Sequence, residues 1–343
     1  MRMGVRYIGS KARLAQGILD VIAESGLTSG RFVDGFCGTG IVSSEAANRG
    51  YSVLANDALY SSALITESSL ICQSEIDFSH FGGYENAIST LNSLQGSEGY
   101  FWRTYSPASF NRCGIERKYF TEVNAKKIDS IRKEISIWKS EGLIGYSEER
   151  LLLADLIVAA NDIANTAGTY GCFLKKWTTH SFSDLELSPT DLRINRVDHK
   201  VITGDVFSLD TNPADIVYLD PPYTKRQYAS YYHIAETIAF NDEPHVDGVA
   251  GLRPWKHNAS PFCYKSKALI ALTECISGLS AENVFLSYSS QGHVSLDDLI
   301  SRLSSLGTVL VYELGEIGRY RPNKTASANG ASVREFLIHI RKL

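Results

Sequence analysis

The sequence predicts an α/β protein in which a mostly parallel sheet, covered by helices on both faces, is interrupted by a mainly helical insertion. Apolar runs typical of strands occur in an early and a late group, a helical pattern lies between the first two, and long helical patterns fill the middle. Strands that alternate with helices form such sheets because each helix buries its apolar stripe against a sheet face. With 343 residues, 44% of them hydrophobic, the chain has enough apolar material for this core.

The early strands predict a first β–α–β unit. Residues 32–36 and 51–57 have strand patterns, and between them the stretch GTGIVSSEAANRG has a helical pattern that ends at Gly50. The late runs predict the rest of the sheet and cover residues 201–206, 215–220, 283–290, 308–314 and 333–340.

The middle of the chain has a different pattern. It opens with GGYENAISTLNSLQGSEGY, whose glycines and serines predict a loop, and continues with helical patterns near 117–141 and over 147–167. We therefore expect residues 1–75 and 199–343 to form the α/β domain and residues 76–198 to form an inserted helical domain.

Charge and cysteine usage exclude several classes of protein. Lys and Arg number 34 against 38 Asp and Glu, a net charge of -4, which argues against a protein that coats nucleic acid with a basic surface but leaves room for a local basic cleft. The six cysteines lack a C-x-x-C pair, so we expect free thiols in a reducing compartment and no metal site. No apolar run approaches the length of a membrane span, so we expect a soluble, intracellular protein with no membrane partner.

A loop rich in glycine joins the first strand to its helix, from Asp34 to Gly40. Glycines let the backbone pass close to a ligand, and the helix N-terminus favours electronegative ligand atoms. Ser43 stands where the third glycine of the G-x-G-x-x-G phosphate fingerprint would be, so a nucleoside without a pyrophosphate, such as S-adenosylmethionine, fits better than a dinucleotide. Asp57 closes the second strand, where an acid binds ribose hydroxyls in dinucleotide-type folds. A tight strand–helix turn without a ligand is the alternative.

The tetrapeptide Asp220, Pro221, Pro222, Tyr223 directly follows a predicted strand, at the end where α/β sheets bind ligands. A primary aromatic amine is a poor nucleophile because its lone pair is delocalised into the ring, so its methylation requires acceptors for both N–H groups. The Asp220 carboxylate and the Pro221 carbonyl can supply these acceptors, and Tyr223 offers a flat face for stacking a base. This pattern is typical of an enzyme that extrudes a base from the duplex. A proline-rich turn with a buried tyrosine is the alternative.

Basic residues gather in two places outside the insertion. Lys225 and Arg226 directly follow the tetrapeptide, and we expect them beside an extruded base. The segment GRYRPNKTASANG has the glycine, serine and asparagine of a loop that grips a nucleic-acid backbone. We expect phosphate contacts there from Arg319, Arg321 and Lys324.

Together these motifs resemble the D12 class of N6-adenine DNA methyltransferases, the alpha group that contains Dam-type enzymes. RYIGSKARL at 6–14 resembles the N-terminal motif of that family, FVDGFCGTG at 32–40 its glycine motif and DPPY at 220–223 its catalytic motif. Ser10 stands where Dam-type members have glycine. The resemblance implies a Rossmann-like, S-adenosylmethionine-dependent methyltransferase sheet with an inserted, mainly helical target-recognition domain.

The resemblance also implies roles for individual residues. The target adenine would be held by the catalytic motif, which consists of Asp220, Pro221, Pro222 and Tyr223. The cofactor and its surroundings would be bound by Tyr7, Lys11, Asp34, Phe36, Gly38, Gly40, Asp57 and Asp205. Among these, Asp57 would bind the ribose and Asp205 would accept from the adenine amine of the cofactor. The chemistry requires no metal.

The leading hypothesis is a site-specific DNA methyltransferase that moves a methyl group from S-adenosylmethionine to N6 of a flipped adenine in double-stranded DNA. An RNA adenine-N6 methyltransferase is the alternative, because the same tetrapeptide occurs there, and a cytosine-N4 DNA methyltransferase is a third hypothesis. A catalytically silent DNA-binding module is disfavoured because every expected acid is present. We expect a cytoplasmic monomer of a prokaryote or phage, with a cognate restriction endonuclease as a separately acting partner.

Overall fold

The computed structural model describes residues 9–317 and 333–343. The chain divides into two compact units. The sheet unit comprises Ser10–Leu59, Val197–Tyr228 and Asn258–Leu343, and the helical unit comprises Met1–Gly9, Tyr60–Arg196 and Ala229–His257. Residues 60–75 and 229–257 therefore cluster with the helical segment, whereas the sequence-based division grouped them with the sheet.

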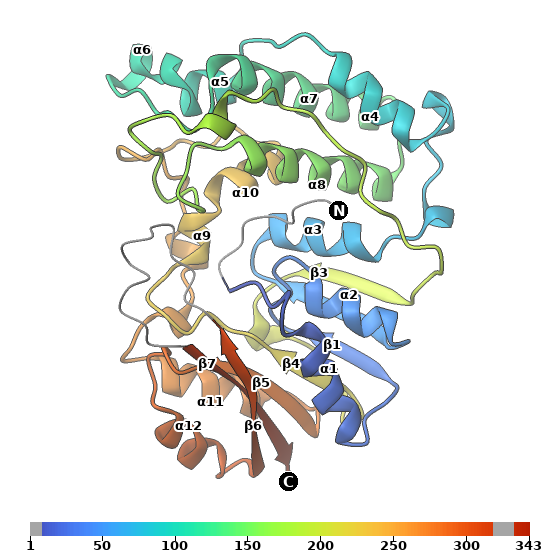
Figure 1. Ribbon diagram of the computed structural model, residues 1–343, viewed down its shortest axis with the longest axis vertical. Helices are drawn as coiled ribbons and strands as arrows, with labels where there is room; N and C mark the ends of the chain where they lie inside the picture. The colour runs from blue at the N-terminus through green and yellow to red at the C-terminus, as the bar shows by residue number, and fades with distance from the viewer. Residues whose placement is uncertain (1–8, 318–332) are drawn as a thin grey trace. The chain divides into compact units, whose positions relative to one another are not determined.

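The sheet unit contains a seven-stranded sheet in the order β3-β2-β1-β4-β5-β7-β6 (Figure 1). The strands are β1 (Arg31–Asp34), β2 (Ser52–Asp57), β3 (His199–Thr203), β4 (Ile216–Leu219), β5 (Asn283–Ser289), β6 (Gly307–Ile317) and β7 (Val333–Lys342). All seven predicted strand runs are thus confirmed. β7 runs antiparallel to β5 and β6, and the other neighbouring pairs are parallel. The predicted α/β class with a mostly parallel, Rossmann-like sheet is confirmed.

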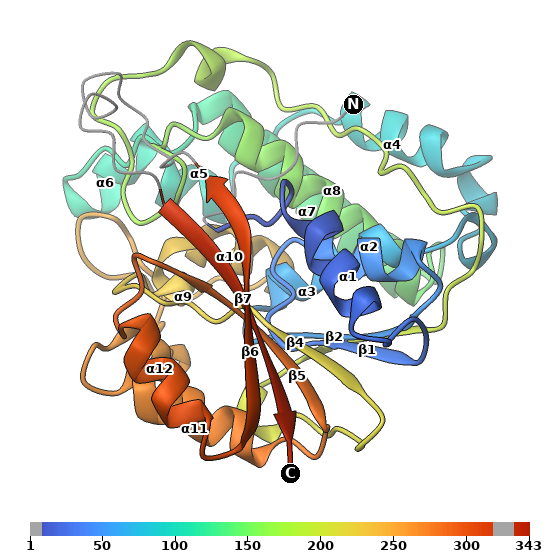
Figure 2. The same ribbon diagram turned by 60° about the horizontal axis from the view of Figure 1, so that its bottom comes forward.

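Four helices cover the faces of this sheet: α1 (Ala15–Glu24), α2 (Ile41–Asn48), α11 (Ala268–Gly278) and α12 (Leu296–Leu303). Figure 2 shows α1 and α2 on one face and α11 and α12 on the other. Alternate strand residues point to opposite faces. Val33 accordingly joins a core cluster with Ile276 of α11 and Leu299 of α12, whereas its neighbour Phe32 stacks on Tyr218.

The strand directions determine which residues meet at the functional edge of the sheet. The parallel strands β1, β2 and β4 end there, at Asp34, Asp57 and Leu219. β7 runs the opposite way, so its beginning lies at this edge, where Glu335 pairs in register with Ser289 at the end of β5. In open α/β sheets ligands bind at this edge.

The helical unit is built mainly from α3 (Tyr60–Leu70), α4 (Tyr84–Ser93), α5 (Tyr100–Tyr105), α6 (Phe110–Cys113), α7 (Glu122–Ser140), α8 (Tyr146–Ile163) and α10 (His233–Phe240), with the short α9 (Tyr228–Tyr231) at its boundary. The two predicted long helices are confirmed as α7 and α8. α8 is buried on almost all sides, as its nearly continuous apolar run predicts.

The prediction of a loop at the start of the insertion was wrong over residues 84–93, which form α4. Ala87, Ile88 and Leu91 lie at helical spacing and are buried, so packing stabilises a helix whose serines and asparagines disfavour it locally. The glycines that suggested a loop, Gly82 and Gly83, lie just before the helix and have positive φ angles.

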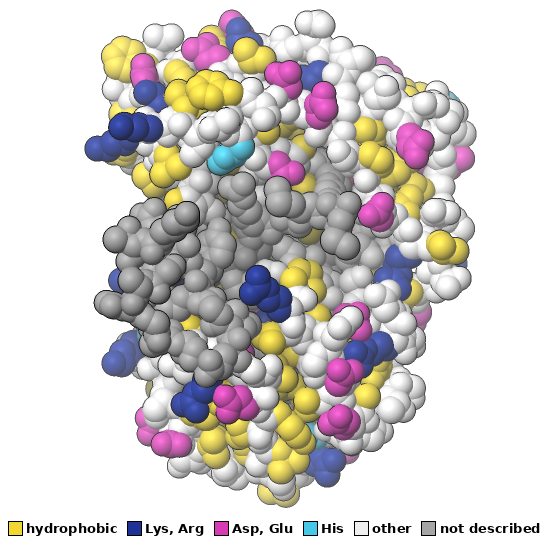
Figure 3. Space-filling model, viewed as in Figure 1, with side chains coloured by type: hydrophobic (Ala, Val, Ile, Leu, Met, Phe, Trp, Pro, Cys, Tyr) yellow, Lys and Arg dark blue, Asp and Glu magenta, His cyan; other side chains and the backbone are white. Residues whose placement is uncertain are grey.

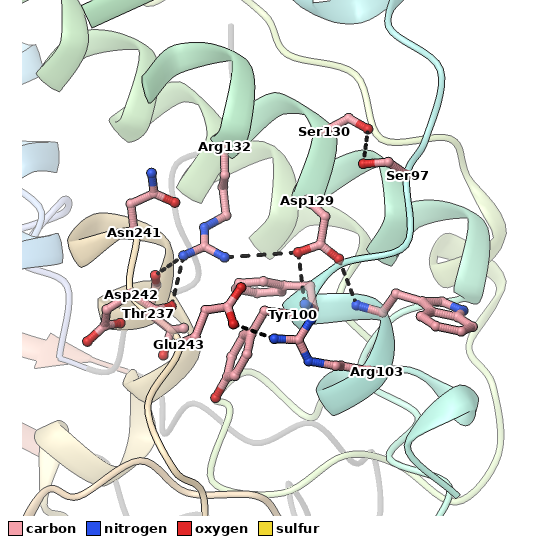
Figure 4. Close-up of polar contacts among 12 residues, drawn as sticks. Ser97, Tyr100, Arg103, Asp129, Ser130, Arg132, Thr237, Asn241, Asp242 and Glu243 are labelled. Atoms are coloured by element: carbon pink, nitrogen blue, oxygen red, sulfur yellow. Dashed lines mark hydrogen bonds and ion pairs between the residues drawn. The ribbon is translucent and has the colours of Figure 1, made fainter. Parts of the chain in front are cut away.

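A buried ion pair on α7 links three segments of the helical unit (Figure 4). Asp129 accepts the backbone N–H groups of Phe101 and Trp102, each at 2.9 Å. Arg132 donates to the backbone carbonyls of Thr237 and Asp242, each at 3.0 Å. Because every one of these partners is a main-chain group, the pair fixes the backbone of α5, of α10 and of the segment after α10 against α7.

Candidate active site

The glycine loop turns sharply at the carboxyl end of β1. Gly38 and Gly40 have positive φ angles of 54° and 76°, which residues with side chains rarely adopt. Gly35 lies so close to β4 that an added Cβ would stand 2.6 Å from the Leu219 Cδ2 atom. The glycines are therefore required for the turn itself, and the turn brings the acids of β1 and β2 together.

Asp57, at the end of β2, fixes this loop from the side. Its Oδ2 accepts the Gly38 N–H at 2.9 Å, and its Oδ1 accepts the Leu59 N–H at 2.8 Å. Asp57 thus both shapes the loop and lies where the sequence predicts a ribose-binding acid.

Two buried oxygens at the loop have no hydrogen-bond donor among the described residues. Asp34 is 1% exposed, and its Oδ2 accepts the hydroxyl of Ser43, the residue in place of the third fingerprint glycine, at 2.7 Å. Its Oδ1 and the Oδ1 of Asn56 have no hydrogen-bond partner among the described residues. Burial raises the pKa of Asp34 to about 7; the Ser43 hydrogen bond opposes the rise and Asp220 adds to it. Because a buried acceptor without a donor is costly, both oxygens suit a ligand that carries N–H groups or positive charge.

Aromatic rings line the adjacent part of the edge. Phe36 meets Phe262 edge to face at 5.5 Å, and Phe207 stacks on Phe262 at 5.5 Å with the ring planes 5° apart. Asp205 is exposed and accepts the Phe207 N–H at 3.1 Å, capping a short 3-10 helix. Phe207 is 41% exposed, so a flat apolar face stands open beside the Asp205 carboxylate.

The predicted tetrapeptide follows β4 at this edge. The side chain of Asp220 is 17% exposed; burial raises the pKa of its carboxyl group, and Lys11 opposes the rise. Pro221 is buried and Pro222 is partly buried. The carbonyl of Tyr223 accepts the His293 N–H at 2.9 Å, so the end of the tetrapeptide is held by the backbone.

Lys11 reaches the tetrapeptide from the N-terminal segment. Its Nζ lies 2.8 Å from the Asp220 Oδ1, 3.9 Å from the Glu335 Oε2 and 5.5 Å from the centre of the Tyr223 ring. Burial lowers the pKa of Lys11, but the charges of Asp220, Tyr223 and Glu335 together raise it above its usual value. Lys11 is therefore protonated at neutral pH. Tyr7, predicted beside Lys11, lies outside the described residues.

Sequence reasoning missed four residues at this edge: Asn56, Phe207, Phe262 and Glu335. Phe207 had a signal, since it follows the predicted Asp205 by two positions. The sequence indicated Glu335 more weakly, as an acidic residue within the apolar run of β7. Phe262 lies in a loop-like stretch and carried no signal at all.

The predicted DNA-binding residues are only partly described. Lys225 and Arg226 are exposed directly after the tetrapeptide, while Arg319, Arg321 and Lys324 lie outside the described residues. On the face shown in Figure 3, basic and acidic side chains of the coloured residues are interspersed.

The cysteines, the potential metal ligands and the apolar helices of the described residues bear on three of the expectations from the sequence. The six cysteines, all of them within the described residues, form no disulfide. No group of three or more His, Cys, Asp or Glu side chains within residues 9–317 and 333–343 is placed to hold a metal ion. No helix in those ranges combines the length and the apolarity needed to cross a membrane.

Known proteins are similar to this chain along almost its whole length. The sequence profile described as D12 class N6 adenine-specific DNA methyltransferase matches residues 7–300. Type II methyltransferase M.FokI from Planomicrobium okeanokoites is 36% identical over 346 residues, which cover 98% of this chain and 53% of that protein. Modification methylase StsI from Streptococcus sanguinis is 34% identical, with 98% and 52% covered.

Type II methyltransferase M.NlaIII from Neisseria lactamica is 32% identical over 342 residues, which cover 98% of both chains. The chain thus spans about half the length of M.FokI and StsI and nearly all of M.NlaIII.

Proposed function

The chain belongs to the D12 class N6 adenine-specific DNA methyltransferases, and from this premise we propose that it transfers a methyl group from S-adenosylmethionine to N6 of an adenine at a specific site in double-stranded DNA. The observation that carries the proposal is the ion pair between Lys11 and Asp220, at the end of the strand next to the glycine loop. It joins the N-terminal segment to the tetrapeptide, at the same edge of the sheet as the glycine loop.

Asp220 is suited to hold the N6 amine of the target. Its carboxylate would accept one N–H and the Pro221 carbonyl the other, which turns the nitrogen lone pair out of the ring and toward the methyl donor. Burial raises the pKa of Asp220, and Lys11 opposes this rise and so favours the charged carboxylate. That charge stabilises the positive charge that builds up on the nitrogen as the N–C bond forms, before one amine proton is lost. Tyr223 would stack on the base.

The residues of the glycine loop fit the methyl donor. S-adenosylmethionine supplies a methyl group activated by a positively charged sulfur. The Oδ1 atoms of Asp34 and Asn56, which have no donor among the described residues, would accept from its ammonium group, and Asp57 would bind its ribose hydroxyls. Asp205 would accept from its adenine amine, and the open face of Phe207 would pack on the adenine ring.

DNA binding would be local and electrostatic. Lys225 and Arg226 would contact phosphates beside the flipped adenine, and the helical unit would read the target sequence. Such contacts are compatible with a net charge of -4, since they require a basic cleft and not a basic surface. M.FokI and M.NlaIII are named type II methyltransferases. We therefore also propose that this chain protects DNA from a separately acting restriction endonuclease.

Methyl transfer from labelled S-adenosylmethionine to unmethylated plasmid DNA tests the function. Purified protein should label the DNA, and nucleoside analysis should find the label in N6-methyladenine. Sequencing that detects methylated bases would then give the target site. Label that appears only in RNA, or only in N4-methylcytosine, would overturn the proposal.

A further inference from the structure

Glu335 is a buried acid at the candidate active site that belongs to none of its sequence motifs. It is the third residue of β7 and only 7% exposed, whereas the preceding Arg334 is exposed. The buried residues of β7 are otherwise apolar except for His339. Burial of a carboxylate is unfavourable in free energy, whereas an apolar side chain would be stabilising at this position of the strand. Stability therefore does not explain the presence of Glu335 here.

The contacts of Glu335 point to Lys11. Its Oε2 lies 3.9 Å from the Lys11 Nζ and has no hydrogen-bond partner among the described residues. The same ammonium lies 2.8 Å from the Asp220 Oδ1. Lys11 thus stands between two carboxylates, in ion-pair contact with Asp220 and about 1 Å too far from Glu335 for a charge-assisted hydrogen bond.

The groups facing Glu335 come from three elements. Burial raises the pKa of Glu335, and the charge of Asp220 adds to the rise. Lys11 from the N-terminal segment and the hydroxyls of Ser289 and Tyr223 oppose it. The two carboxylates and one ammonium therefore titrate as a coupled group.

We propose that Glu335 is a positioning residue of the methylation site, which shares the Lys11 ammonium with Asp220 and so sets how tightly Lys11 holds the carboxylate that must accept the target amine. The inference rests on the proposed methyltransferase function. With Asp220 as its one partner, Lys11 competes with the amine for that carboxylate. With Glu335 as a second partner, Lys11 can shift toward it as the amine arrives and remain paired.

Substitution of the Glu335 charge tests this role. Glu335→Gln should lower kcat about tenfold or more, as a misplaced reacting group does, while KM for S-adenosylmethionine stays within about twofold. Because the charges of Glu335 and Asp220 interact, the substitution should also shift the acid limb of the kcat–pH profile. Glu335→Asp keeps the charge and should keep the limb near its wild-type position. Glu313→Gln, at an exposed site on β6, is the matched control and should change neither quantity.

The outcomes separate this inference from the proposed function. A wild-type protein that methylates no adenine would refute the function itself. An active wild type together with Glu335→Gln of unchanged kcat and unchanged pH profile would overturn the positioning role, as would a loss of kcat with no shift of the acid limb. Thermal melting checks folding. If Glu335→Gln does not fold, Glu335→Asp decides: reduced kcat with a wild-type acid limb supports the role, and wild-type kcat overturns it, because the shorter side chain draws back from Lys11.

Discussion

The two units each contain a buried cluster of opposite charges, and the clusters differ in what their charges contact. In the helical unit, Asp129 and Arg132 bond to main-chain groups, two N–H groups and two carbonyls (Figure 4). In the sheet unit, Lys11 meets the side chains of Asp220 and Glu335, and the Glu335 Oε2 lacks a hydrogen-bond partner among the described residues.

Burial does not distinguish the clusters, because it raises the pKa of both Asp129 and Asp220. The two clusters differ in the hydrogen-bond partners of their charges. Charges whose partners are backbone groups hold segments of chain in place and have little capacity left for a ligand. Charges that meet only other side chains can exchange partners, and unpaired oxygens among them can be satisfied by a ligand. The first cluster is therefore expected to affect stability and the second to affect activity.

The sharpest test of the comparison is Asp220→Ala. It removes the proposed acceptor of the target amine, so kcat for methyl transfer should fall about 10³-fold or more, in the range that loss of a transition-state electrostatic contact reaches. Affinity for S-adenosylmethionine, measured by calorimetry, should change by less than about threefold, since Asp34 and Asp57 remain. Asp297→Ala, an exposed acid on α12, is the control. Activity within tenfold of wild type would disprove the role of Asp220.

Asp129→Ala should reduce the stability of the protein, whereas Asp220→Ala should reduce its activity. It leaves the Phe101 and Trp102 N–H groups without their acceptor and Arg132 without its buried counter-charge, so the free energy of unfolding should fall by about 3 kcal/mol. Urea unfolding followed by circular dichroism measures this loss. Lys133→Ala, at an exposed position of the same helix, should cost less than about 0.5 kcal/mol. If both variants were equally stable, the main-chain contacts of Asp129 would not stabilise the unit.

The pKa of Asp34 predicts how the stability of the sheet unit depends on pH. Its pKa is about 7 in the folded protein and ~3.9 in an unfolded chain. Between these values the folded state binds more protons than the unfolded state. Stability therefore falls as pH rises from about 4 to about 7, by at most ~1.4 kcal/mol per pH unit. Asp34→Asn should remove this slope, so its melting temperature relative to wild type should rise from pH 5 to pH 8. Parallel melting curves at all pH values would show that Asp34 does not titrate in this window.

The smallest expected effect concerns exposed charges. The double variant Lys225→Ala, Arg226→Ala should weaken DNA binding several-fold and reduce the slope of log affinity against log salt by about two, one for each lost phosphate contact. Arg302→Ala, exposed on α12, serves as the control. An unchanged salt slope in the double variant would place the phosphate contacts elsewhere. Binding measured at several salt concentrations supplies the test.

The sequence predicted the sheet more completely than the helical segment. Seven apolar runs correspond to the seven strands, because β1, β2, β4, β5 and β7 are buried along most of their length and carry a nearly continuous apolar signal. β3 and β6 are more exposed, but their sequences still contain apolar residues typical of strands. α4 was missed because its serines and asparagines resemble a loop, and only the burial of Ala87, Ile88 and Leu91 stabilises it as a helix. The assignment of residues 60–75 and 229–257 to the helical unit also depends on packing between distant segments, which no local pattern encodes.

The candidate site was predictable where its residues lie in motifs at strand ends. Asp34, Asp57 and Asp220 share one edge because parallel strands place their carboxyl ends together. Their roles in binding and catalysis stay predictions. Phe262 and Glu335 could not be assigned in this way, since each reaches the edge through a contact and not through a motif.

The sequence by itself determined the fold class, the family and the acids at the ends of β1, β2 and β4, because periodicity and short motifs are local properties of the chain. Tertiary structure alone decided that Lys11 stands between Asp220 and Glu335. That arrangement depends on the antiparallel direction of β7, which brings the beginning of this strand to the edge where the parallel strands end. Apolar periodicity is the same in either direction, so strand direction, and with it the second carboxylate of the site, emerges only when the sheet assembles.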